Sequence, residues 1–189
     1  MERTFETTDQ SSLLTTRKIV VAGILAAIAI LLGSTPIGFI PVPTAAGAAT
    51  TMHIPAIIGG VLEGSPVGWL IGTIFGIYSF LRATLPLFKD PLVAILPRMF
   101  IGITAYYAYA ACRRYNEIVA VAIAAAVGTL TNTIGVLTMA VVRGYMEAGA
   151  ALAVGVTHGI PEVIVAIIIT VAVVAAWKRL EYGRAGSRI

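Results

Sequence analysis

The chain has 189 residues, of which 58% are apolar and only 12% are charged. A water-soluble domain usually carries about twice that share of charge, and a helix that spans a bilayer needs about 20 apolar residues. Two uncharged runs, Ile19–Leu62 and Ile118–Val142, therefore exclude an ordinary soluble protein and predict an integral membrane protein. The net charge of +4 is explained by membrane topology rather than by nucleic-acid binding, because the basic residues flank apolar segments.

The apolar segments predict an all-α membrane protein whose helices form one compact bundle over residues 17–180. Residues 1–16 are polar and are expected to form a cytosolic tail, as are residues 181–189. Cys112 is the only cysteine, so an internal disulfide is excluded.

Six transmembrane helices are expected in chain order. The three prolines between Thr35 and Pro43 end the first helix, and Pro161 suits the first turn of the last one. The expected ranges are 18–33, 52–62, 66–82, 92–112, 117–142 and 161–177.

The basic residues predict the orientation of these helices. Nine of the thirteen lie at the chain ends or between the fourth and fifth helices, namely Arg3, Arg17, Lys18, Arg113, Arg114, Lys178, Arg179, Arg184 and Arg188. Because cytosolic segments are enriched in Lys and Arg, both termini are predicted to be cytosolic. The other four, Arg82, Lys89, Arg98 and Arg143, would lie at the outer ends of helices.

Polar residues in the outer half of the bundle are the candidate site. Arg98 lies inside the fourth helix, where a charge faces a cavity or a partner. Asn132 either hydrogen-bonds a neighbouring helix or binds substrate. Glu162, with His158 nearby, could bind substrate, pair with Arg98, or be stabilised by the positive end of a helix dipole. The other candidates are His53, which opens the second helix, and Lys89, which belongs to a loop over 83–90 that could be an ordinary turn or a lid.

Small residues indicate two closely packed helix faces. The first is a stripe with a four-residue repeat along the third helix, which favours packing inside the bundle: Gly60, Gly64, Gly68, Gly72 and Gly76. The second lies on the first helix and includes Ala22 and Ala26, one turn apart.

Enzyme signatures are absent from the sequence. It has no nucleotide-binding loop, no His-Glu-x-x-His and no Gly-x-Ser-x-Gly. His53, His158 and Glu162 lack the paired spacing of a zinc site, so neither a metal nor a cofactor is predicted.

Several stretches together resemble the substrate-binding S components of energy-coupling factor (ECF) vitamin transporters, over residues 17–180. They comprise Ala22–Ala27, His53–Gly64, the Gly-rich third helix, Asp90–Arg98, Leu130–Thr133 and Gly159–Glu162. The resemblance implies a prokaryotic cell-membrane protein that binds a vitamin in an outward cavity. It also implies partners: a transmembrane T subunit, docked on the first helix through Ala22 and Ala26, and two cytosolic ATPases that supply the energy.

The outer basic residues favour an anionic substrate, with pantothenate as the leading candidate and a corrinoid, riboflavin, folate or a queuosine precursor as others. Two different functions remain open. One is an intramembrane enzyme that uses His158 and Glu162 as acid and base. The other is a self-sufficient small transporter or channel that oligomerises through the glycine stripe.

Overall fold

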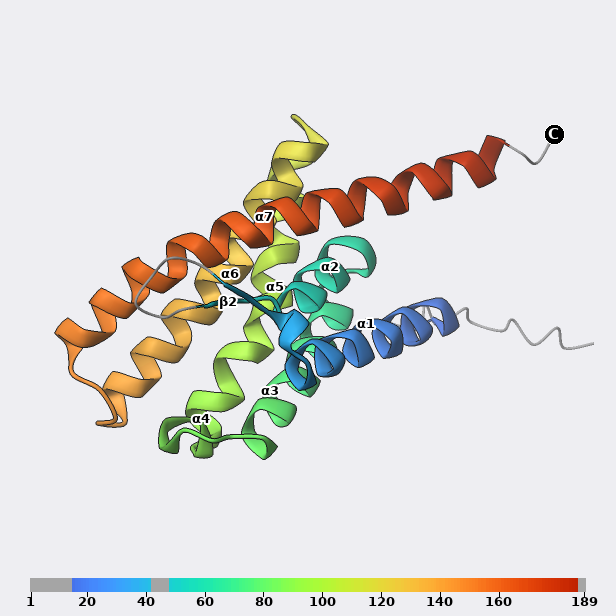
Figure 1. Ribbon diagram of the computed structural model, residues 1–189. Helices are drawn as coiled ribbons and strands as arrows, with labels where there is room; N and C mark the ends of the chain where they lie inside the picture. Colours follow the sequence, from blue (N-terminus) through green and yellow to red (C-terminus); the bar gives the residue numbers. More distant parts are fainter. Residues whose placement is uncertain (1–14, 42–47, 187–189) are drawn as a thin grey trace, which may run out of the picture.

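The computed structural model describes residues 15–41 and 48–186, and the remaining parts of the two expected tails lie outside these ranges. The described chain is a helical bundle with one small hairpin of two antiparallel strands (Figure 1). The elements are α1 (Thr16–Ser34), η1 (Pro36–Gly38), β1 (Phe39–Pro41), β2 (Ala48–Thr50), α2 (Ile54–Glu63), α3 (Ser65–Leu81), η2 (Pro86–Lys89), α4 (Pro91–Ala94), α5 (Leu96–Cys112), α6 (Glu117–Val142) and α7 (Ala148–Gly186). The predicted helical class is confirmed, whereas the hairpin was not predicted.

Helix capping explains several of these boundaries. The Asn116 side chain accepts a hydrogen bond from Val119 N at 3.1 Å and begins α6. Asp90 caps α4 in the same way, through Leu92 N at 2.9 Å. Between α2 and α3 the backbone turns at Gly64, whose φ of +99° disfavours any residue with a Cβ.

The last helix differs most from its prediction. It begins at Ala148 rather than near Pro161, and Pro161 lies inside it. A proline removes only one backbone donor, and membrane helices tolerate it where neighbouring groups compensate. Glu162 is therefore in mid-helix, and the proposed stabilisation by a helix N-terminus is wrong. The helix also continues to Gly186, beyond the predicted start of the C-terminal tail.

The glycine stripe packs α3 against α5, as the sequence favoured. A Cβ on Gly68 would lie 2.7 Å from the Cα of Gly102, and one on Gly72 would lie 2.2 Å from the Arg98 carbonyl oxygen. Such distances allow only glycine, so the two backbones touch. The stripe is covered within the chain, which argues against its use as an oligomer interface.

On α1, the small residues that face away from the bundle lie one position later in the sequence than the predicted pair. Ala22 and Ala26 are 1% and 5% exposed and pack inside the bundle, so their assignment as a docking surface is wrong for this structure. The small residues that face outward are Gly23 and Ala27. A Cβ added to Gly23 would meet no atom within 4 Å.

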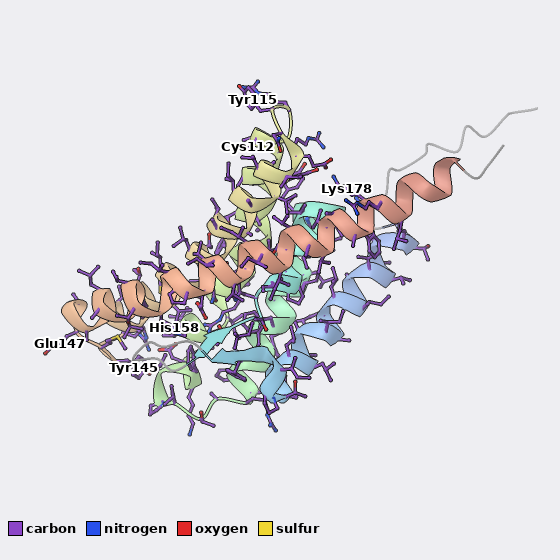
Figure 2. All side chains as sticks on the ribbon, turned by 45° about the horizontal axis from the view of Figure 1, so that its top comes forward. Cys112, Tyr115, Tyr145, Glu147, His158 and Lys178 are labelled. Atoms are coloured by element: carbon purple, nitrogen blue, oxygen red, sulfur yellow. The ribbon has the colours of Figure 1, made fainter. Side chains whose placement is uncertain are left out.

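The bundle has two distinct ends. The end that we call the terminal end contains the start of α1, the α5–α6 turn and the end of α7, and the opposite end, the hairpin end, contains β1, β2, η2 and the α6–α7 turn (Figure 1). Figure 2 shows Cys112, Tyr115 and Lys178 at the terminal end, and Tyr145 and Glu147 at the hairpin end.

Four helical segments of the described chain are long and apolar enough to cross a membrane, namely Thr16–Ser34, Pro91–Cys112, Glu117–Val142 and Ala148–Leu180. The apolar helices α2 and α3 are shorter. Helix α2 is buried along nearly its whole length, with Ile57 fully enclosed, because α3, α5, α6, α7 and α1 surround it. The protein is thus a multi-pass membrane protein.

Candidate functional site

A cavity of about 480 Å³ lies at the hairpin end. Its walls come from the hairpin, from α3, α5, α6 and α7, and from the segment 83–90, which we call the lid segment. Polar side chains gather on the walls contributed by α5, α6 and α7, including Arg98, Asn132, Thr133, His158 and Glu162. The volume falls within the range of about 300–1,000 Å³ that is typical of small-molecule sites.

Arg98 is a buried cation on the cavity wall, with only 5% of its surface exposed. Pro97 has no N–H to offer the carbonyl of Val93, one turn earlier, and the Arg98 Nη1 donates to that carbonyl instead, at 2.6 Å. Its Cζ lies 5.0 Å from the ring centre of Phe88 and 5.7 Å from that of Phe75. Two features of the sequence therefore hold the guanidinium in place. One is the backbone carbonyl left unpaired by Pro97, and the other is the pair of aromatic rings near Cζ.

No salt bridge joins Arg98 to a carboxylate among the described residues, and its Nε has no hydrogen-bond partner. A guanidinium removed from water is costly unless an anion compensates it. The predicted Arg98–Glu162 salt bridge is therefore not formed in this structure, although Glu162 is close enough to attract Arg98 electrostatically. Arg98 is left with unused hydrogen-bonding capacity beside the cavity.

Two further unused polar atoms belong to side chains on the cavity wall. Asn132 on α6 is 8% exposed, and its Oδ1 accepts no hydrogen bond. His158 on α7 (Figure 2) places Nε2 at 2.9 Å from Glu162 Oε1, while its Nδ1 has no partner. Buried polar groups are nearly always paired, so these atoms and the Arg98 Nε indicate a polar ligand.

Glu162, in contrast, is surrounded by donors. Its carboxylate receives bonds from Thr50 N (2.9 Å), His158 Nε2 (2.9 Å) and Thr133 Oγ1 (3.2 Å), and also from the Thr50 hydroxyl. Oε1 accepts three of these bonds and Oε2 accepts one, so most of the acceptor positions of the carboxylate are occupied. This pairing also disfavours Glu162 as a catalytic acid or base.

His53 is fully buried and is not among the residues that line the cavity. Its Nε2 lies 3.0 Å from Thr129 Oγ1, and that hydroxyl already donates to the Ala125 carbonyl at 2.8 Å. The hydroxyl must therefore accept from His53, which requires a proton on Nε2. His53 thus supports α6 through Nε2, while its Nδ1 has no hydrogen-bond partner among the described residues.

The lid segment contributes apolar side chains to the cavity, among them Leu87 and Phe88, while Lys89 is exposed and does not line it. Asp90 fastens the end of this segment through a 2.5 Å salt bridge to Arg143 at the end of α6. The hydrogen bond from Arg143 holds the pKa of the Asp90 carboxyl below its ordinary value. The pair therefore stabilises the fold above the ordinary carboxyl pKa of about 4, and this contribution is lost only as the pH falls through the lowered value.

Several cavity residues were missed by the sequence analysis, notably Thr50, Phe75, Tyr78 and Phe88. The aromatic residues lie toward the C-terminal end of α3 and in the lid segment, next to the predicted site, but an apolar ring in a membrane helix carries no distinctive signal. Thr50 lies in the hairpin, which the sequence did not predict.

A second cavity of about 340 Å³ lies between α6 and α7. Its lining is almost entirely aliphatic and includes no charged side chain. It therefore lacks the groups that would orient a polar ligand. Among the described residues no cluster of three or more His, Cys, Asp or Glu side chains could hold a metal ion.

Comparison with known proteins agrees with this geometry. A family model described as "ECF transporter, substrate-specific component" matches residues 17–174. The pantothenic acid transporter PanT of Lactococcus lactis subsp. cremoris is 31% identical over an alignment of 156 residues, and the match covers 67% of this chain and 76% of that protein. Because the family match covers most of the chain, including every predicted substrate-site residue, this protein belongs to the family of ECF transporter substrate-specific components.

Proposed function

We propose that this protein is the membrane subunit that captures pantothenate, or a closely related anionic vitamin, for an ECF-type importer in the plasma membrane of a prokaryote. The observation that carries the proposal is the buried Arg98 guanidinium, which lines the cavity and forms no salt bridge with a carboxylate of the described residues. The similarity to a pantothenic acid transporter supports the choice of vitamin.

The unused polar atoms match the chemistry of pantothenate. Its carboxylate suits Arg98, because a guanidinium binds carboxylates with two parallel hydrogen bonds. Its hydroxyl and amide groups can donate to Asn132 Oδ1 and to the Nδ1 of a neutral His158, which lack partners. Phe75 and Phe88 would cover the aliphatic part of the ligand.

The chain has no nucleotide-binding loop, so we assign ATP hydrolysis to two partner ATPase subunits and membrane coupling to a T subunit. The docking surface on this chain is the outward face of α1, where Gly23 and Ala27 are one turn apart. Small residues there would let another helix approach closely.

The direct test is thermal stabilisation of the detergent-purified chain by pantothenate, compared with pantothenol, in which a hydroxymethyl group replaces the carboxylate. A ligand at 100 times its Kd stabilises a protein by about 2.7 kcal/mol, which gives a clear rise in Tm. We expect stabilisation by pantothenate and much weaker stabilisation by pantothenol.

Riboflavin, folate, a corrinoid and a queuosine precursor form the comparison set. Stabilisation by one of these but not by pantothenate would overturn the choice of vitamin. Equal stabilisation by pantothenate and pantothenol would show that Arg98 does not recognise the carboxylate.

A further inference from the structure

We infer that Glu162 is a positioning residue: its carboxylate fastens the β1–β2 hairpin to α7 and so holds one wall of the cavity in place, rather than binding substrate. The inference rests on the proposed function only in taking this cavity as the substrate site. It goes further by naming the residue that holds the hairpin wall of that cavity in place.

The contacts of Glu162 join three separate parts of the chain. Thr50 in β2 contributes both its N–H, at 2.9 Å, and its hydroxyl. Thr133 on α6 donates at 3.2 Å, and His158 lies one turn away on α7 itself, at 2.9 Å. Glu162 is 2% exposed, so these bonds are shielded from water and are stronger than they would be at a surface.

Among the described residues, no other hydrogen bond joins the hairpin to α7. Thr50 is paired in register with Phe39 of β1, and both residues line the cavity. On its other side the hairpin is tied back to η1, since Thr51 N donates to the Gly38 carbonyl at 3.0 Å. Helix α7 contacts β2, and the two bonds from Thr50 to Glu162 are the hydrogen bonds described across this contact.

The chemistry of these bonds explains why a carboxylate is needed. All four groups that face Glu162 donate, and a carboxylate only accepts. In Glu162→Gln the carbonyl oxygen must stay on the side of Thr50 N, which can only donate, and the NH₂ group then faces Thr133 Oγ1, a hydroxyl that can accept. The side chain keeps its size, but the bonds from Thr50 lose their charged acceptor, and the attachment of the hairpin is weakened.

Amide hydrogen exchange measures that attachment directly. In the ligand-free purified protein, we expect Glu162→Gln to speed exchange in the peptide spanning 48–53 by about tenfold, the scale of losing one hydrogen bond to a charged acceptor. Exchange in the peptide spanning 83–90 should change less than about twofold, because Asp90 and Arg143 fasten that segment independently.

The matched control is Asp90→Asn, which also converts a buried carboxylate to an amide. It should speed exchange in 83–90 and leave 48–53 nearly unchanged. If Glu162→Gln does not fold, Thr50→Val provides the same test with only the hydroxyl removed and should speed exchange in 48–53 by a smaller factor. Unchanged exchange in 48–53, or an equal rise in both peptides, would overturn the inference.

Ligand kinetics separate positioning from direct binding, with pantothenate as the probe. We expect Glu162→Gln to raise the dissociation rate about tenfold while the preference for pantothenate over pantothenol is kept, because Arg98 is untouched. Loss of binding with unchanged hairpin exchange would make Glu162 a substrate ligand instead. If the unmodified chain binds no pantothenate, the proposed vitamin is wrong, yet the ligand-free exchange experiment still decides the role of Glu162.

Discussion

Arg98 illustrates how a single side chain can hold the fold and still line a cavity. Its Nη1 replaces the backbone donor that Pro97 lacks, by reaching the Val93 carbonyl, and aromatic rings of Phe75 and Phe88 lie near the guanidinium. These contacts fix the side chain but leave its positive charge without a carboxylate partner among the described residues. An anionic ligand would complete the site.

We predict that Arg98→Gln weakens pantothenate binding by at least about tenfold, on the order of 1.4 kcal/mol, because glutamine removes the positive charge that would pair with the carboxylate. Isothermal titration calorimetry on the purified variant measures the effect. Lys89→Gln is the matched control, since it removes one exposed charge of the lid segment and should change Kd less than about twofold. Equal effects of the two variants would indicate general electrostatic attraction instead of a specific contact.

At the level of elements, helix α1 has one face buried in the bundle and one face exposed. Ala22, Ala26 and Ala29 are buried against the bundle, whereas Val20, Ile24 and Leu31 are more than half exposed. Gly23 and Ala27 form a shallow region among these large side chains. An outer face of this shape suits the close approach of a partner helix in the membrane.

We predict that Ala27→Trp abolishes vitamin uptake in cells that contain the ECF partner subunits, while the purified variant binds pantothenate with unchanged Kd. A large ring on the outward face would block the partner helix but lies away from the cavity residues. Copurification of the T subunit provides a second measurement.

Ala22→Trp is the contrasting variant, because a ring forced into a packed interior destabilises the fold and should lower its Tm and its expression. Normal uptake by Ala27→Trp would exclude this face of α1 as the docking surface.

At the level of the whole molecule, charge is distributed unequally between the two ends. The terminal end contains Arg17, Arg113, Arg114 and Lys178, whereas Arg82, Lys89 and Arg143 lie toward the hairpin end. Two of the basic residues at the terminal end connect helices, Arg17 to Glu63 at 3.0 Å and Lys178 to Glu117. The positive-inside rule therefore predicts that the terminal end is cytosolic and that the cavity opens outward.

Thiol labelling of intact cells tests this orientation. We predict that Cys112, which is partly exposed at the terminal end, does not react with an impermeant maleimide until the membrane is permeabilised. Lys89→Cys in a Cys112→Ser background should react without permeabilisation. The opposite pattern would place the cavity on the cytosolic side and contradict the uptake mechanism.

The sequence by itself determined the membrane class, the helical fold and the helix boundaries that carry local signals. Helix α6 was predicted with its observed bounds, because the Asn116 cap and the charges at Glu117 and Arg143 delimit an apolar run. The candidate site was also partly predicted, since Arg98, Asn132, His158 and Glu162 are polar residues in apolar surroundings and all line one cavity. Polar groups in a membrane segment are costly enough to stand out.

Only the tertiary structure decided which faces of the helices meet and which polar groups are already paired. In a membrane both the buried and the lipid-facing sides of a helix are apolar, so the periodicity that orients a helix in a soluble protein is lost, and the outward face of α1 was placed one residue away. The hydrogen-bond partners of Glu162 could not be predicted from neighbouring residues in the sequence either, because Thr50 lies 112 residues earlier in the chain. Hydrogen bonds between such distant residues depend on how the helices pack, and it is this packing that surrounds Glu162 with four donors while Arg98 forms no salt bridge with a described carboxylate.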